Sequence, residues 1–166
     1  RSFMKNYPVR YTIRPLNPAA HRFEVSCEVA TPAPEGQRFS LPAWIPGSYL
    51  IRDFARHIVA IRAEAGGKPV HLCKLDKQTW QAEALPAGRA LTVTCEIHAW
   101  DLSVRGAHLD QTHGFFNGTS VFLRVLGQES SPCLVDLRPP EGKAFSAWRV
   151  ATSLPPAAGE KGCARR

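Results

Sequence analysis

Hydrophobic and polar residues alternate along much of this chain. The clearest alternation covers residues 9–13, 23–29 and 91–99, where apolar side chains occupy every second position. A period of two places these side chains on one face of a β-strand, so each segment is predicted to be a strand with one buried and one solvated face. Further strand candidates are residues 38–44, 58–65, 70–75, 79–84, 120–126, 133–137 and 145–150.

Turn-forming residues separate the predicted strands. Glycine and proline mark loops and tight turns, and the chain contains 12 and 14 of them. We therefore predict an all-β fold, an antiparallel β-sandwich of about eight to ten short strands. Residues 49–57 have the only helical pattern, and we expect at most one short helical turn there. The turn segments are 17–18, 32–36, 66–67, 86–88 and 139–142.

The length of 166 residues fits one domain with short tails. We expect a tail over residues 1–8, a β-sandwich domain over 9–154, and a linker over 155–166. The last segment begins with two prolines followed by small residues, which is typical of a linker. It is interpreted as the connection to a further domain.

The formal net charge of +7 is concentrated at the two ends of the chain. Four of these charges lie in the terminal segments 1–5 and 158–166, and the remaining arginines are scattered among acidic residues. Nucleic-acid binding needs clustered positive charge, and a membrane span needs a long apolar run. We expect neither a nucleic acid nor a membrane as a partner.

Cysteine and methionine usage predicts the compartment. The five cysteines leave one unpaired in any intramolecular scheme, and none forms a CxxC pair. Free thiols at apolar positions such as Cys27 and Cys95 indicate a reducing environment. Met4, the only methionine, is interpreted as the initiator, which predicts a cytoplasmic protein.

The nearest approach to a metal site is the segment HLDQTH. On a strand, His108 and Asp110 would share a face, and His113 could fold back from the following turn. The alternative is that these are polar residues at a strand end. The sequence contains no HExxH, GxSxG or glycine-rich phosphate loop. Asn117 and Gly118 begin a glycosylation sequon, but this dipeptide is first of all a tight-turn signal.

Two longer stretches resemble a known family. LPAWIPGSYLIRDFARHI, residues 41–58, and WDLSVRGAHLDQTHGFFNGTSVFLRV, residues 100–125, are similar to signature segments of the amino-terminal domain of the glycyl aminopeptidase family of zinc metallopeptidases. Residues 10–25 and 148–155 also fit. The resemblance implies a parent enzyme whose thermolysin-like domain carries HExxH and the zinc. It implies no cofactor and no catalytic residue in this chain, which is expected to be inactive alone.

The resemblance also implies partners and candidate site residues. The partners are the catalytic domain of the same polypeptide and, in the parent enzyme, a peptide substrate. In related aminopeptidases this domain closes one end of the substrate cleft and supplies a polar contact near the α-ammonium group. The cleft candidates here are Asn117, Phe115, Phe116 and Thr119, and the interdomain candidates are Arg52, Asp53 and Arg56. The alternative for the 114–120 segment is a structural hairpin turn.

Two other hypotheses remain open from the residues themselves. The chain could be a free-standing β-sandwich that binds peptide or carbohydrate through exposed aromatics, including Trp44 and Tyr49. It could also be a small metal-binding protein built on the histidines of HLDQTH.

Overall fold

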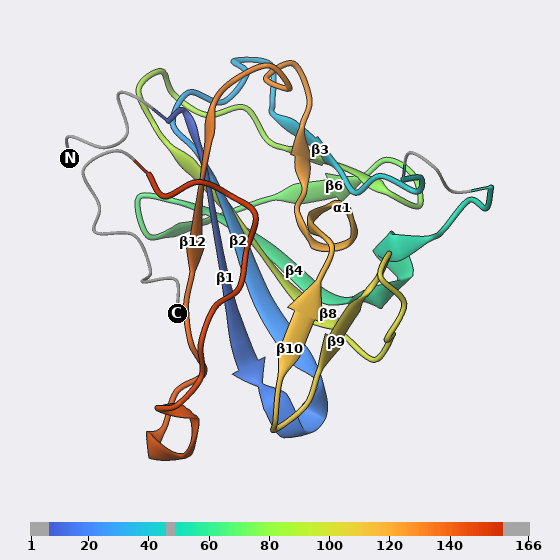
Figure 1. The fold of residues 1–166 in the computed structure, drawn as a ribbon. Coiled ribbons are helices and arrows are strands. Elements are labelled where there is room, and N and C mark those ends of the chain that lie inside the picture. The colour runs from blue at the N-terminus through green and yellow to red at the C-terminus, as the bar shows by residue number, and fades with distance from the viewer. Residues whose placement is uncertain (1–6, 46–48, 158–166) are drawn as a thin grey trace.

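The structure is a computed structural model that describes residues 7–45 and 49–157. Its largest sheet has six strands, and a four-stranded sheet and a two-stranded hairpin lie beside it (Figure 1). All strand pairs are antiparallel except β1 with β12, which is parallel. In spatial order the six-stranded sheet consists of β12 (Cys133–Leu137), β1 (Val9–Asn17), β2 (Arg22–Val29), β8 (Leu91–His98), β4 (Ile58–Ala65) and β5 (Lys68–Val70). The four-stranded sheet consists of β11 (Arg124–Val125), β3 (Arg38–Ser40), β7 (Thr79–Ala82) and β6 (Leu72–Lys74), and the hairpin of β9 (Ala107–Leu109) and β10 (Gly114–Phe116).

The period-two pattern determines which face of the large sheet is buried. Along β1 and β2 buried residues alternate strictly with half-buried ones. The register pairs Ile13 with Val25 and Val25 with Cys95, so these inward side chains line up across three strands. Because a side chain in a strand points to the opposite face from its neighbour, this register gathers the apolar positions on one side.

The second sheet covers that apolar face. Phe39 of β3, Trp80 of β7 and Val125 of β11 belong to the same buried cluster as the inward residues of β1, β2 and β8. A polar contact also joins the two layers: the Tyr11 hydroxyl donates a 2.6 Å hydrogen bond to the Leu123 carbonyl oxygen. Burial raises the pKa of this tyrosine, so it remains a neutral donor. The result is a sandwich with one shared core.

The all-β, mainly antiparallel prediction is confirmed, with more and shorter elements than expected. The described residues contain twelve strands and four short helical turns. Residues 70–75 divide between β5 and β6 because the chain crosses from one sheet to the other at His71. Residues 38–44 form a strand only as far as Ser40, and Pro42, which lacks an N–H, cannot extend the pairing. The helical turns are η2 (Pro18–Ala20), η3 (Phe54–His57), α1 (Gly118–Val121) and η4 (Lys143–Phe145).

Two predicted strands have a different structure. Residues 145–150 contain no strand, because Gly142, with φ of 112°, leads into η4 and the Phe145 and Trp148 rings then pack edge to face at 5.6 Å. Residues 120–126 begin inside α1 and reach the sheet only at β11. The Asn117–Gly118 pair is the start of that helical turn and not a two-residue hairpin turn.

Several sequence predictions fall outside the described part of the chain. These are the interpretation of Met4, most of the 1–8 tail, and residues 158–166 of the linker. Among the described residues, four cysteines are free thiols and no helix is long and apolar enough to cross a membrane.

Replacing Tyr11 with phenylalanine tests the polar contact between the layers. Tyr11→Phe removes the hydroxyl and leaves the Leu123 carbonyl without that donor, so we expect the free energy of unfolding to fall by about 1–2 kcal/mol. Urea unfolding measures the change. The matched control is Tyr49→Phe, because the Tyr49 side chain is fully exposed. An equal midpoint for Tyr11→Phe and the original chain would contradict the role assigned to this bond.

Candidate functional site

The segments that carry the cleft and interdomain candidates border one small cavity, although none of those candidates lines it. A small cavity of about 20 Å³ is lined by residues from η3, from the loop after β8, from β9 and from α1. Figure 1 shows the β9–β10 hairpin and α1 beside the segment that contains η3. The structure therefore brings together segments that are 60 residues apart in the sequence.

Asn117 holds α1 and a neighbouring loop together. Its side-chain oxygen accepts the backbone N–H of Thr119 at 3.0 Å, which makes it the N-cap of α1. Its side-chain nitrogen donates to the Val104 carbonyl at 3.4 Å, and its backbone N–H donates to the Gly106 carbonyl at 2.9 Å. The amide thus supports local structure and retains one oxygen lone pair for a further donor.

The two phenylalanines of β10 point in opposite directions. Phe116 is partly buried and packs edge to face on Phe23 and Phe122. Phe115, its neighbour, is 42% exposed. This alternation follows from the strand, and it leaves Phe115 as the aromatic side chain that is available on this hairpin.

Arg52 connects the segment before η3 to the loop after β8. Its guanidinium lies 4.0 Å from the Asp101 carboxylate, and its Nε atom is buried without a hydrogen-bond partner among the described residues. Asp53 and Arg56 are exposed. Among the three interdomain candidates, Arg52 is the one with a long-range side-chain contact to another described residue. Burial, reinforced by the charge of Arg56, lowers the pKa of His57.

Exposed apolar side chains are concentrated on the two loops that the Arg52–Asp101 ion pair joins. We call this group of side chains the loop surface. The alternation of Trp100, Leu102 and Val104 is typical of a half-buried strand, yet all three are more than half exposed in this loop. The sequence pattern therefore gave no signal of exposure. The loop surface consists of Tyr49, Ile51, Trp100, Leu102 and Val104.

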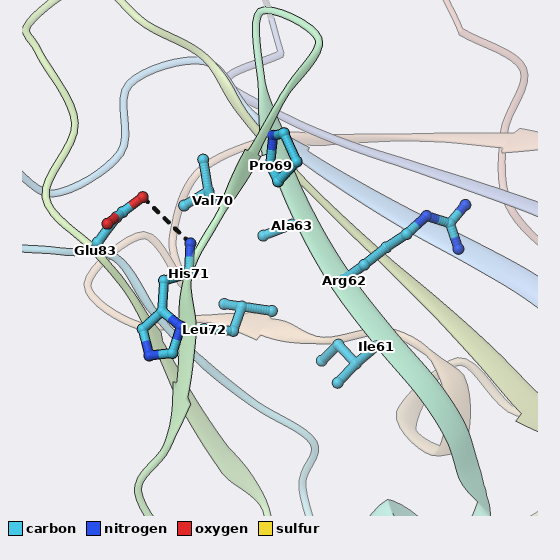
Figure 2. A pocket seen from close by; sticks show the side chains of 8 residues that line it. All are labelled: Ile61, Arg62, Ala63, Pro69, Val70, His71, Leu72 and Glu83. Carbon is cyan, nitrogen blue, oxygen red and sulfur yellow. Dashed lines mark hydrogen bonds between the residues drawn. The ribbon is translucent and has the colours of Figure 1, made fainter.

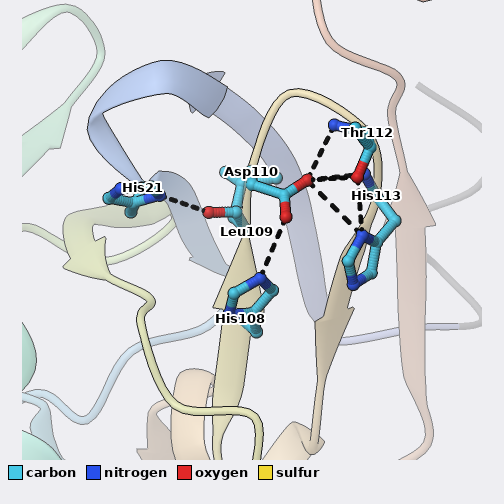
Figure 3. A network of polar contacts seen from close by, with 6 residues as sticks. All are labelled: His21, His108, Leu109, Asp110, Thr112 and His113. Atoms are coloured by element: carbon cyan, nitrogen blue, oxygen red, sulfur yellow. Dashed lines mark hydrogen bonds and ion pairs between the residues drawn. The ribbon is translucent and has the colours of Figure 1, made fainter.

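The histidines of HLDQTH converge on Asp110 (Figure 3). The Nε2 atom of His108 lies 3.2 Å from Asp110 Oδ2, and the Nδ1 atom of His113 lies 3.4 Å from Oδ1. Asp110 Oδ1 also accepts bonds from the Thr112 hydroxyl, the Thr112 N–H and the His113 N–H. These donors hold the pKa of the Asp110 carboxyl well below its usual range.

A shallow groove of about 560 Å³ lies elsewhere, where β4 and β5 approach β6 (Figure 2). Its charged groups already have partners: Glu83 accepts the His71 N–H at 3.2 Å, and Arg62 lies 3.6 Å from Glu24. None of the residues singled out in the sequence lines this groove. The remaining lining residues are apolar: Ile61, Ala63, Pro69, Val70 and Leu72.

Comparison with known proteins identifies relatives of most of the chain. The profile of a family described as "Peptidase M61 N-terminal domain" matches residues 10–165. A crystal structure of an aminopeptidase N family protein from Idiomarina loihiensis is 41% identical, with a TM-score of 0.84 over 92% of this chain. The match covers 25% of that longer protein. No curated protein matches the chain.

A more distant structural match is to an M1 zinc metallopeptidase mutant from Deinococcus radiodurans, bound to a Tyr-Ser-Ala substrate. It is 13% identical, with a TM-score of 0.47 over 79% of this chain and 31% of that one. This similarity is too weak to establish a shared fold.

Removing the Asn117 side chain tests its structural role. Asn117→Ala deletes the N-cap of α1, so we expect the free energy of unfolding to fall by about 1 kcal/mol. Asn117→Ser supplies another capping oxygen and should recover most of this loss. Urea unfolding of the two variants makes the comparison. Equal stability of the alanine and serine variants would show that the cap contributes nothing.

Proposed function

We propose, because this chain belongs to the peptidase M61 N-terminal domain family, that it is the non-catalytic amino-terminal domain of a zinc-dependent aminopeptidase of the glycyl aminopeptidase type. The sequence contains no HExxH, so it lacks the motif that supplies two zinc ligands and a general base in such enzymes. The zinc and the catalytic groups accordingly belong to a separate domain. The chain matches about a quarter of the Idiomarina protein, which supports a modular parent.

The loop surface is the observation that carries the docking part of this proposal. Five large side chains are more than half exposed on two adjacent loops, and the Arg52–Asp101 contact joins those loops. Neighbouring apolar side chains exposed in this way mark an interaction site, since removing apolar area from water contributes about 25 cal/mol per Å². The partner we assign to this surface is the catalytic domain of the same polypeptide.

The β9–β10 hairpin supplies the proposed contact with substrate. Phe115 is exposed beside the loop surface, while Asn117 has a free lone pair and Thr119 follows it on α1. Docking through the loop surface would place these side chains at the edge of the partner domain. There Phe115 would form part of a wall, together with Phe116 behind it, that blocks the cleft beyond the terminal residue. An exopeptidase needs such a wall to position the chain end of its substrate.

Leu102→Asp tests the docking surface. Leu102 is 74% exposed in the described chain, so the substitution should leave the stability of the 166-residue chain unchanged. In the parent polypeptide it would bury a carboxylate in an apolar interface. We expect this domain of the parent to lose about 1–3 kcal/mol of stability, measured by urea unfolding.

Leu75→Asp is the matched control. Leu75 is also exposed but lies at the turn between β6 and β7, outside the loop surface. We expect it to change neither the isolated chain nor the parent. If Leu102→Asp has the same effect in the isolated chain and in the parent, the loop surface is not an interdomain contact.

Phe115→Ala tests the cleft contact in the parent enzyme. Truncating a side chain that helps position the substrate should lower kcat/KM on glycyl substrates about tenfold, equivalent to 1.4 kcal/mol. Val59→Ala is the control, because Val59 is exposed on β4 and is not part of the hairpin. An unchanged kcat/KM for Phe115→Ala would exclude the hairpin from the cleft while leaving the docking proposal intact.

A further inference from the structure

We propose that His108, Asp110 and His113 form a binding site for one divalent late transition-metal ion, represented by Zn²⁺, with an open coordination position. One ligand atom from each residue lies within 4.8 Å of the other two. Two imidazoles and one carboxylate are a donor set that suits zinc and its neighbours. This inference does not rest on the proposed function.

The spacing of the ligand atoms fits a tetrahedral ion. With zinc–ligand bonds of about 2.0–2.1 Å, adjacent corners of the tetrahedron lie about 3.3 Å apart. The distance from His108 Nε2 to Asp110 Oδ2 is 3.2 Å, and that from His113 Nδ1 to Asp110 Oδ1 is 3.4 Å. The first distance supplies one edge of the coordination polyhedron, whereas the second ends on the other oxygen of the same carboxylate. A rotation of the exposed His113 side chain would bring its nitrogen to the same ion, because all three ligand atoms already lie within 4.8 Å of one another.

The hairpin positions these atoms through its backbone. His108 lies on β9 opposite Phe115, and the Asp110 N–H donates to the His113 carbonyl at 3.0 Å, which closes the turn between the strands. This turn brings the His113 ring to 5.2 Å from the His108 ring, measured between centroids. Trp100 packs against His108, with ring centroids 4.8 Å apart. The turn thus holds His108 and Asp110 together before any ion arrives.

The charge state of Asp110 favours a cation. Four hydrogen-bond donors around it keep the carboxylate ionised at neutral pH. A metal bond to Oδ2 would leave the three bonds to Oδ1 in place, which come from the Thr112 hydroxyl, the Thr112 N–H and the His113 N–H. His108 is 4% exposed, and its Nδ1 atom is buried without a partner among the described residues. Zinc-bound histidines usually donate that second N–H. We therefore expect micromolar affinity and not the tight binding of a structural zinc.

Three protein ligands leave at least one position for water or an external group. An ion at this site would fix the exposed His113 against β9 and stiffen the hairpin that presents Phe115. Because metal and protons compete for the imidazole nitrogens, binding must weaken as the pH falls.

Isothermal titration of the tag-free 166-residue chain with ZnCl₂ tests the proposal. The protein is first treated with chelator, and its accessible thiols are alkylated, because Cys73 and Cys133 are exposed and would also bind zinc. We expect one ion per chain at pH 7.5 with a micromolar Kd. His113→Ala should weaken binding at least tenfold, and so should a shift to pH 5.5.

Two further variants make the result specific. His71→Ala removes an exposed histidine outside the cluster and should leave the Kd unchanged. Asp110→Asn keeps an acceptor for the turn but removes the charge, and it should weaken binding at least tenfold while circular dichroism remains that of the original chain. The absence of saturable binding, or equal Kd values for His113→Ala and the original chain, would overturn the proposal and leave the cluster as a hydrogen-bonded turn.

Discussion

The inward face of β1, β2 and β8 is the surface against which the rest of this domain packs. Three strands with matched registers place their apolar residues on one side, and no polar side chain interrupts the centre of that face except Tyr11. Burying this face requires a second layer, and the short strands β3, β7 and β11 provide it. Since those strands have only two to four residues, their stability comes from packing on the large sheet more than from their own pairing.

Tyr11 shows how the core accommodates a polar atom. Its ring packs on Phe122 and its hydroxyl reaches the Leu123 carbonyl, in the segment between α1 and β11. That carbonyl belongs to a stretch whose start is set by the Asn117 cap. The position of the candidate hairpin thus depends on contacts that begin in the core of the sandwich.

The large strands were predictable because their apolar period is regular. The bounds of β4 and β12 agree with the predicted segments 58–65 and 133–137. The structure of residues 120–126 and 145–150 was not predictable from their period. A capped turn at Asn117 and ring packing between Phe145 and Trp148 override the local pattern there. The candidate chemistry was partly predictable: the HLDQTH spacing indicated that its two histidines and Asp110 could meet. The exposure of Trp100, Leu102 and Val104 was not predictable, since the same alternation is usual in half-buried strands.

The sequence by itself determined the fold class, the buried face of the main sheet and the family, because periodicity and long specific motifs are local properties of the chain. Only the tertiary structure decided which segments meet. It joined the loops at residues 52 and 101 by an ion pair, turned Phe116 inward and Phe115 outward, and left a run of apolar residues exposed. These outcomes depend on how distant segments pack. An alternating apolar pattern looks the same in the sequence whether its side chains are buried against another segment or exposed.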